Sequence, residues 1–238
     1  MLGRPVWSMI LSEGTSIEAF PVLHAVTNDE IVRRPDFLQQ ARAFMETTGS
    51  RGALQLRAPR TDGSPLYDMA ITLAEAQRDT GAWLVVNDRV DVALCAAAKG
   101  VQLTAKSLEL EDARLVAQSL AIGVSVHDLE EGIAARLSGA SWAVVSRAAE
   151  PSERGGSRRR EHLDARAPTS DKALALIALL TRGDMPIVVI GGVVPQHVGP
   201  LRRVGVHGIA AIRGIWDTEN AARAASDYLT HYDRDGGG

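Results

Sequence analysis

Short apolar runs alternate with helical patterns along most of the chain. In each helical pattern the apolar residues recur three or four positions apart, which is the spacing of one buried helix face. The apolar runs between them are too short for helices and fit buried strands. The predicted strands cover 22–26, 53–56, 83–86, 101–103, 122–126, 142–145, 187–190 and 208–212. The predicted helices cover 36–48, 66–80, 90–98, 109–118, 129–137, 172–181, 196–204 and 218–232.

Eight strand–helix pairs in this order are typical of a parallel sheet with crossover helices. A length of 238 residues suits one barrel of eight such pairs, which takes about 250 residues. We therefore predict an α/β fold, a single (β/α)8 TIM barrel over residues 21–232. Residues 1–20 are predicted to be an N-terminal extension, loose or forming an extra strand at the bottom of the barrel, and residues 233–238 a disordered tail. An open doubly wound sheet is the main rival, but no GxGxxG follows the first strand.

The composition narrows the class of protein and its compartment. A formal net charge of -3 gives no electrostatic reason to expect binding to nucleic acid or to a membrane. No apolar run approaches the ~20 residues of a membrane span, and the N-terminus lacks the order of regions found in a signal peptide. Cys95 is the single cysteine, so no disulfide can form within the chain and we expect a cytoplasmic location. Cys95 lies in an apolar helical run, and we expect it to be buried there.

The candidate site lies where the predicted strands end. In TIM barrels the active site is built from the loops at the carboxyl ends of the strands. Many polar residues and glycines occupy these loops, although some of them are expected to cap helices instead. They are Thr27, Asn28 and Asp29; Gln55, Arg57 and Arg60; Asn87, Asp88, Arg89 and Asp91; Gln102, Thr104 and Lys106; Ser125 and His127; Arg147; Gly191 and Gly192; Arg213 and Gly214.

Two stretches after the last two strands have the features of a phosphate site. Gly191 and Gly192 follow the seventh strand, and 211–214 follows the eighth. In TIM barrels, backbone N–H groups and the N-terminus of a short helix commonly hold phosphate at this place. Glycine at Gly192 or Gly214 lets the backbone approach the anion without a Cβ in the way. The alternative is that both stretches are merely tight turns.

Asn87 and Asp88 admit two interpretations. Hard cations prefer oxygen ligands, so the pair can bind a hydrated Mg²⁺ together with a phosphate. Alternatively, Asp88 caps the following helix and pairs with Arg89. A single carboxylate is a poor magnesium site, and the sequence leaves both interpretations open.

His127 also has two interpretations. A histidine at the mouth of a barrel can exchange protons near neutral pH. It equally fits the N-terminal side of a helix, where either His127 or Asp128 can act as the cap.

The loop after the sixth strand, 147–168, is rich in arginine. Such a loop can close over an anionic substrate, because guanidinium groups pair with phosphate through two hydrogen bonds. A solvated loop without this role is the default interpretation of the same residues. The arginines are Arg147, Arg154, Arg158, Arg159, Arg160 and Arg166.

Several short motifs, in order and spacing, resemble those of the thiamine phosphate synthase/TenI family over about 22–216. The motifs read Leu23-His24-Ala25-Val26-Thr27-Asn28-Asp29, Gln55-Leu56-Arg57, Val86-Asn87-Asp88-Arg89-Val90-Asp91-Val92-Ala93-Leu94, Gly100-Val101-Gln102-Leu103 and Gly123-Val124-Ser125-Val126-His127 with Glu130-Glu131 behind it, then 186–193 with Gly191-Gly192, and 205–214.

This resemblance implies a role in thiamine biosynthesis. Synthases of the family join a hydroxymethylpyrimidine pyrophosphate to a thiazole phosphate, with Mg²⁺ steadying the departing pyrophosphate. TenI-type relatives instead aromatise the thiazole phosphate by moving a proton, with a histidine at the position of His127. Since synthases carry that histidine too, it does not separate the two activities. By resemblance, Gln55, Arg57 and Asn87 match pyrophosphate-binding positions, Asp88 matches a magnesium ligand, and Gly192 with the Ile212–Arg213 backbone matches the cradle of the thiazole phosphate.

The chain departs from the synthase pattern at several of these positions. Pro59 stands where the synthase pattern has a lysine, and Arg213 replaces a serine of the phosphate cradle. The loop after the fourth strand, 102–107, carries Ser107 in place of the second magnesium carboxylate. The Thr-x-Thr-Lys segment expected after the sixth strand is missing. We hypothesise that fixed cations, Lys106 among them, take the place of Mg²⁺.

These observations favour a TenI-like thiazole tautomerase in which His127 carries the proton. On this interpretation the partner is a phosphorylated small molecule and no cofactor is required. A divergent thiamine phosphate synthase, which would use Mg²⁺, is the first alternative. A barrel that binds a phosphorylated ligand without converting it is the second. The sequence leaves a homo-oligomer open.

Overall fold

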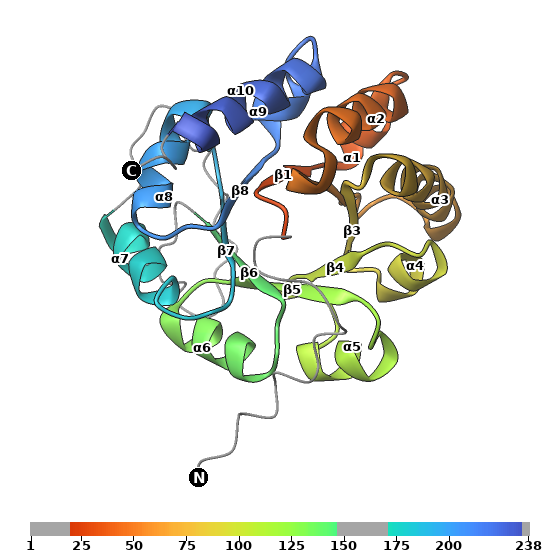
Figure 1. Ribbon diagram of the computed structural model, residues 1–238. Helices are drawn as coiled ribbons and strands as arrows, with labels where there is room; N and C mark the ends of the chain where they lie inside the picture. Colours follow the sequence, from red (N-terminus) through yellow and green to blue (C-terminus); the bar gives the residue numbers. More distant parts are fainter. Residues whose placement is uncertain (1–19, 147–170, 235–238) are drawn as a thin grey trace.

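The structure, a computed structural model, describes residues 20–146 and 171–234. Eight parallel strands form a closed barrel in which each strand pairs with its neighbours in chain order and β8 pairs with β1. Figure 1 looks along the barrel and shows the helices as an outer ring around the strands. The strands are β1 Leu23–Val26, β2 Gly52–Leu56, β3 Trp83–Asn87, β4 Gly100–Leu103, β5 Ala121–Val126, β6 Trp142–Ser146, β7 Ile187–Ile190 and β8 Gly208–Ala211. The predicted single (β/α)8 barrel is confirmed.

Each predicted helix is present, and within residues 20–146 and 171–234 four one-turn helices accompany them. The longer helices are α2 Phe37–Thr48, α3 Gly63–Thr80, α4 Val90–Cys95, α5 Leu110–Val116, α6 Leu129–Leu137, α7 Asp171–Leu180, α8 Val198–Arg203 and α10 Ala221–Arg234. The short ones are α1 Asp29–Val32, η3 Gly49–Arg51, η4 Pro195–His197 and α9 Arg213–Trp216. A single turn has no repeating apolar face, so the hydrophobic pattern gives no sign of the short helices.

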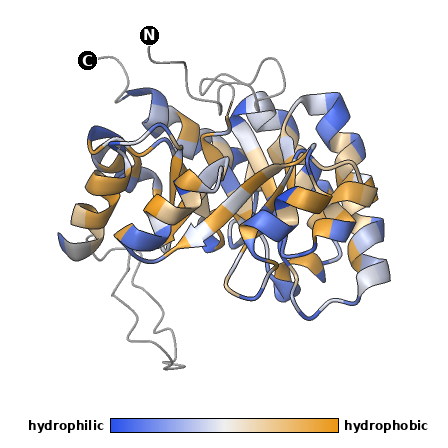
Figure 2. Ribbon diagram, turned by 90° about the horizontal axis from the view of Figure 1, so that it is seen from below, coloured by the Kyte–Doolittle hydropathy of each residue, from blue (hydrophilic) through white to orange (hydrophobic). Residues whose placement is uncertain are grey.

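The strands bury both of their faces in separate clusters. Outward-facing residues such as Leu54 and Val101 pack under the helices in the larger cluster. Inward-facing residues fill the barrel in a smaller one, made of Phe20, Val26, Ala53, Trp83, Val85, Trp142, Val144, Val188 and Ala210. Figure 2 shows the helices with a hydrophobic and a hydrophilic side. This division explains why the strands appear in the sequence as continuous apolar runs.

Large aromatic rings fill the end of the barrel where the strands begin. The centroid of the Phe20 ring lies 5.2 Å from that of Trp142 and 5.5 Å from that of Trp83. Trp142 is completely buried, and a Cβ at Gly123 would stand 1.9 Å from its ring. The absence of a side chain at Gly123 therefore makes room for the indole. Phe20, which we assigned to the extension, belongs to this plug, while residues 1–19 lie outside the described residues.

Polar side chains inside the barrel satisfy one another. The Gln55 Nε2 atom lies 2.9 Å from Nδ1 of His24, whose Nε2 lies 3.2 Å from the carbonyl of Pro21. The amide therefore donates to Nδ1, and the imidazole donates from Nε2. Burial lowers the pKa of His24 to about 4, so the ring is neutral at neutral pH. Trp142 donates its indole N–H to Gln102 Oε1 at 2.7 Å.

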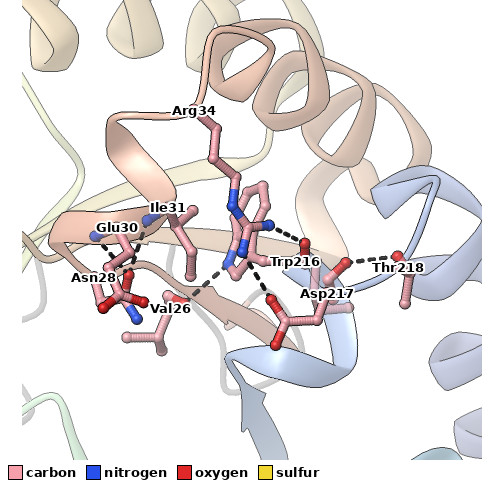
Figure 3. A network of polar contacts seen from close by, with 9 residues as sticks. Val26, Asn28, Glu30, Ile31, Arg34, Trp216, Asp217 and Thr218 are labelled. Atoms are coloured by element: carbon pink, nitrogen blue, oxygen red, sulfur yellow. Dashed lines mark hydrogen bonds and ion pairs between the residues drawn. The ribbon is translucent and has the colours of Figure 1, made fainter.

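A polar seam joins the first and last units of the ring. The Trp216 indole N–H donates to the carbonyl of Val26 at 2.9 Å, and Arg34 donates to the carbonyl of Trp216 and to Asp217 (Figure 3). Beside it, α10 packs against α2. The hydrogen bonds fix α9 to the end of β1, which keeps the loops after β8 and β1 in register.

Two expectations about exposure and chain ends need correction. Cys95 is exposed instead of buried, because the inward side of α4 is taken by Val90, Ala93 and neighbouring residues. The last helix continues to Arg234, two residues into the predicted tail, and Asp233 pairs with Arg51 at 2.6 Å. No helix within 20–146 or 171–234 is long and apolar enough to span a membrane.

The buried imidazole makes stability depend on pH. The pKa of His24 is 6.5 in the unfolded chain and about 4 in the fold, so the unfolded state binds more protons between these values. The contribution of His24 to the free energy of unfolding should not change with pH above about pH 6.5. It should lower that free energy by about 3 kcal/mol from pH 7 to pH 4. The smaller lowering of the His207 pKa acts in the same direction. Urea unfolding of the wild type and of His24→Gln measures the effect, because the glutamine amide can still form hydrogen bonds but cannot titrate. Equal pH dependence in both proteins would contradict it.

Candidate functional site

The carboxyl ends of the strands form one rim, which we call the mouth. Because the barrel is closed and all strand pairs are parallel, the loops after the eight strands emerge on the same side. Arg147 and the arginine-rich loop 147–168 lie outside the described residues. The other predicted positions at this rim are Gln55, Arg57, Asn87, Asp88, Lys106, His127, Gly191, Gly192, Ile212, Arg213 and Gly214.

Buried amides line the inside of the mouth. Gln55 is 2% exposed, and the contact of its Nε2 with His24 leaves the carbonyl end of the amide for another donor. Asn87 is 8% exposed, and its Oδ1 is buried without a hydrogen bond among the described residues. An unpaired buried acceptor costs free energy unless a water or a ligand donates to it. Both amides thus lie at the inner side of the strand ends, and the Asn87 oxygen is a buried acceptor without a donor in the described protein.

Asp88 is held by the loop after β4. Its Oδ1 accepts hydrogen bonds from the Thr104 hydroxyl at 2.6 Å, from the Thr104 N–H at 3.2 Å and from the Ser107 hydroxyl. The residue has φ +64°, which a non-glycine residue adopts only when its surroundings hold it there. The carboxylate thus organises the 104–107 loop.

Of the two sequence interpretations of Asp88, the structure contradicts the helix cap. The residue does not cap α4, and Arg89 pairs with Asp91 at 2.6 Å, which lowers the pKa of the Asp91 carboxyl. Magnesium also fits poorly, because the site offers one carboxylate and three donors already occupy one of its oxygens. Within the part of the chain that the structure describes, no three His, Cys, Asp or Glu side chains are placed to hold a metal ion.

His127 is oriented by a carboxylate one helical turn away. Its Nδ1 lies 3.0 Å from Glu131 Oε2, and the same oxygen accepts the backbone N–H of His127 at 2.7 Å. Asp128, and not His127, caps α6 by accepting the N–H of Glu131 at 2.8 Å. A carboxylate beside Nδ1 favours the proton on that nitrogen and leaves the Nε2 lone pair for chemistry. The His127 side chain is 43% exposed, so a ligand can reach it.

The cations of the mouth differ in accessibility. Arg57 is half-buried just after β2, where its backbone N–H donates to the Thr27 hydroxyl at 2.9 Å. Lys106 and Arg213 are exposed. Arg60 is also exposed but lines an outer hollow between α1 and α3, together with Arg33.

The turns after β7 and β8 come close to each other. Gly191 has φ +111° and Gly192 φ +59°, conformations that glycine adopts at little cost. After β8, Ile215 and Trp216 donate to the carbonyl of Ile212 as α9 begins. The N–H groups of the first turn of a helix have no partner inside it, so those of Arg213 and Gly214 point outward. The two turns thus place the backbone of Gly192 and of Gly214 on the same side of the mouth.

The sequence analysis did not identify three residues that hold groups of the mouth in place. His24 carried a signal, because it is a polar residue at an inward position of an apolar strand. Glu131 stands four residues after His127, the spacing at which helical side chains meet. Tyr228, which contacts the turn after β7, looks in the sequence like any buried residue of the last helix.

Comparisons with known proteins agree on one family. The family model described as thiamine monophosphate synthase matches residues 23–215. A thiamine-phosphate synthase of Methanoculleus marisnigri is 32% identical over 211 residues, which cover 87% of this chain and 94% of the relative. One from Pyrococcus furiosus is 30% identical, with 86% of this chain and 91% of the relative covered.

Solved structures share the barrel fold of this chain. Thiamine phosphate pyrophosphorylase from Pyrococcus furiosus superposes with a TM-score of 0.76 at 26% identity, covering 93% of this chain and all of that one. A 3-hexulose-6-phosphate synthase, at 16% identity and a TM-score of 0.60, shares the fold.

From the hydrogen bonds between Asp88 and Ser107 we predict how Mg²⁺ affects the stability of the protein and of a Ser107 variant. Ser107→Asp places a second carboxylate against Asp88, so without metal it should lower the free energy of unfolding by about 1 kcal/mol. Added Mg²⁺ should then raise the melting temperature of this variant, whereas that of the wild type stays constant. Ser107→Asn, similar in size but uncharged, is the control and should not respond. Thermal melts in EDTA and in Mg²⁺ measure this, and a wild type stabilised as much as Ser107→Asp would contradict it.

Proposed function

The chain belongs to the thiamine phosphate synthase/TenI family, and from this premise we propose that it binds a thiazole phosphate at the mouth and isomerises it by proton transfer. The reaction is a tautomerisation, which conserves atoms and electrons: one C–H bond breaks and another forms. It needs a group that takes a proton and gives it back. We assign this role to His127.

The His127–Glu131 pair carries the proposal. With the proton of Nδ1 held by Glu131, Nε2 is the basic nitrogen that faces a ligand. Once Nε2 has taken the proton, the carboxylate stabilises the imidazolium. The same ring then returns the proton to a different atom of the substrate. One pair of side chains is therefore sufficient for both halves of a tautomerisation.

The rest of the mouth suits binding of the substrate. We place its phosphate at the turns after β7 and β8, on the N–H groups of Gly192, Ile212, Arg213 and Gly214. The exposed Arg213 side chain adds positive charge there. In the proposal, the amides of Gln55 and Asn87, at the inner side of the strand ends, lie beneath the uncharged part of the ligand. Arg57 and Lys106 stand as further cations at the rim.

No step of this proposal passes through a metal ion. The Asp88 carboxylate is occupied by Thr104 and Ser107, and tautomerisation expels no pyrophosphate whose charge a metal must balance. In the proposal, Lys106 contributes fixed charge near the Asp88 loop. We infer a cytoplasmic location from the single cysteine.

A divergent thiamine phosphate synthase is the second candidate, favoured by the names of the curated relatives. Three residues argue against it. Pro59 stands where the synthase pattern has a lysine, Ser107 where it has a carboxylate and Arg213 where it has a serine. A barrel that binds a phosphorylated ligand without converting it is the third. It leaves the Glu131 contact of His127 without a chemical purpose.

Removal of the proton carrier tests the lead proposal. We expect His127→Ala to lower the rate of thiazole phosphate isomerisation by about 10²-fold or more, because general acid–base catalysis typically contributes that much. Glu131→Gln should lower it about tenfold and change its pH dependence, since the neutral amide no longer stabilises the imidazolium. Glu130→Gln, which removes a charge from the adjacent position, serves as the control. The rate is followed by the change in ultraviolet absorbance on aromatisation, and full activity of His127→Ala would dismiss the mechanism.

Binding of the two candidate substrates separates the three functions. In calorimetry we expect thiazole phosphate to bind on its own, with the same affinity in EDTA and in Mg²⁺. We expect hydroxymethylpyrimidine pyrophosphate to bind weakly or not at all. Coupling of the two compounds with full dependence on Mg²⁺ would establish the synthase instead, and binding of thiazole phosphate without any turnover would establish the non-catalytic barrel.

A further inference from the structure

Tyr228 of α10 reaches the place where the turns after β7 and β8 meet. Its hydroxyl donates to the carbonyl of Val193 at 2.6 Å, immediately after the Gly191–Gly192 turn. The side chain is 1% exposed, and burial raises the pKa of the phenol, so the group stays a donor. One hydroxyl from the last helix thus fixes the backbone after the seventh strand.

The same hydroxyl lies against the turn after β8. A Cβ built on Gly214 would stand 2.1 Å from Tyr228 Oη and 3.4 Å from the carbonyl oxygen of Val193. Gly214 therefore lacks a side chain because the phenol occupies that space, a role that the sequence analysis had given to a bound anion. The two turns are close-packed across the phenol, without room for either to shift toward the other.

We propose that Tyr228 is a positioning residue that sets the spacing of the two backbone turns and with it their affinity for phosphate. The proposal rests on the proposed function in one respect, that these turns receive the phosphate of the substrate. N–H groups from two separate strand ends bind one anion well only if their separation is fixed beforehand. The β7 and β8 strands fix it at their register, and Tyr228 fixes it again where the chain has left the sheet.

The chain offers a matched control one helical turn further along α10. Tyr232 is partly buried, and its hydroxyl donates to the carbonyl of His207 at 2.9 Å. His207 precedes β8, at the end of the barrel opposite the mouth. Tyr228→Phe and Tyr232→Phe each remove one hydroxyl and one bond to a backbone carbonyl, but only the first touches the turns.

The test measures phosphate affinity separately from stability. Both variants should unfold at lower urea concentration than the wild type. In ³¹P NMR titrations of the folded proteins, Tyr228→Phe should bind inorganic phosphate about tenfold more weakly than the wild type, and Tyr232→Phe should bind it equally well. Equal affinities in all three proteins would overturn the proposal and assign Tyr228 a purely structural role.

The Gly214 contact gives a second, independent measurement. Gly214→Ala should disturb the turn, because its Cβ meets Tyr228 Oη, and should weaken phosphate binding at least as much as Tyr228→Phe. In the double variant Gly214→Ala/Tyr228→Phe the nearest atom becomes Tyr228 Cζ at 3.2 Å, so the loss should be smaller than the product of the two single effects. Strictly multiplicative losses would show that the two residues do not act through one contact.

The outcomes also separate this proposal from the proposed function. A wild type that binds inorganic phosphate but not thiazole phosphate would refute the proposed function, while the inorganic phosphate titrations still decide the role of Tyr228. A wild type that binds neither would overturn both. Calorimetry with thiazole phosphate on the same three proteins completes the comparison.

Discussion

The interior of the barrel excludes water, so a polar side chain inside it needs a hydrogen-bond partner within the protein. His24 and Gln55 satisfy each other across β1 and β2, and Trp142 and Gln102 do so between β6 and β4. Each bond fixes the orientation of an amide, because a buried donor left without an acceptor is costly. Hydrogen bonds inside the barrel therefore help to determine how the amides beneath the mouth are oriented. Asn87 is the exception, with an oxygen that nothing in the described protein satisfies.

The same reasoning explains how much the sequence could tell. The eight strands and the longer helices were predictable, since burial on one face or both leaves a periodic pattern. The polar rim was predictable as a set, because strand ends in a closed parallel barrel must meet. The contacts within the rim were not. Ser107 carries no local sign that its hydroxyl lies on Asp88, and Tyr228 is 35 residues from the carbonyl that it contacts.

The loop after β4 is closed by hydrogen bonds to a single carboxylate oxygen. The Ser107 hydroxyl donates to Asp88 Oδ1, and so do the hydroxyl and the backbone N–H of Thr104. A carboxylate in place of Ser107 would repel Asp88 and would need a cation between the two, whereas the hydroxyl attracts it. The resemblance to the synthases implies a carboxylate at this position, so the proposed metal-free function depends on Ser107.

The seam between the chain ends has a consequence for synthesis. β1 gains its second neighbour only when β8 has emerged, and α9 and α10 then fasten the junction through Trp216 and through the packing of α10 on α2. Until that moment a nascent chain carries two open sheet edges, which are templates for pairing with other chains. The last eighth of the polypeptide, from β8 onward, thus decides whether the preceding strands are protected. A chain whose synthesis stops before this segment forms a sheet that cannot close.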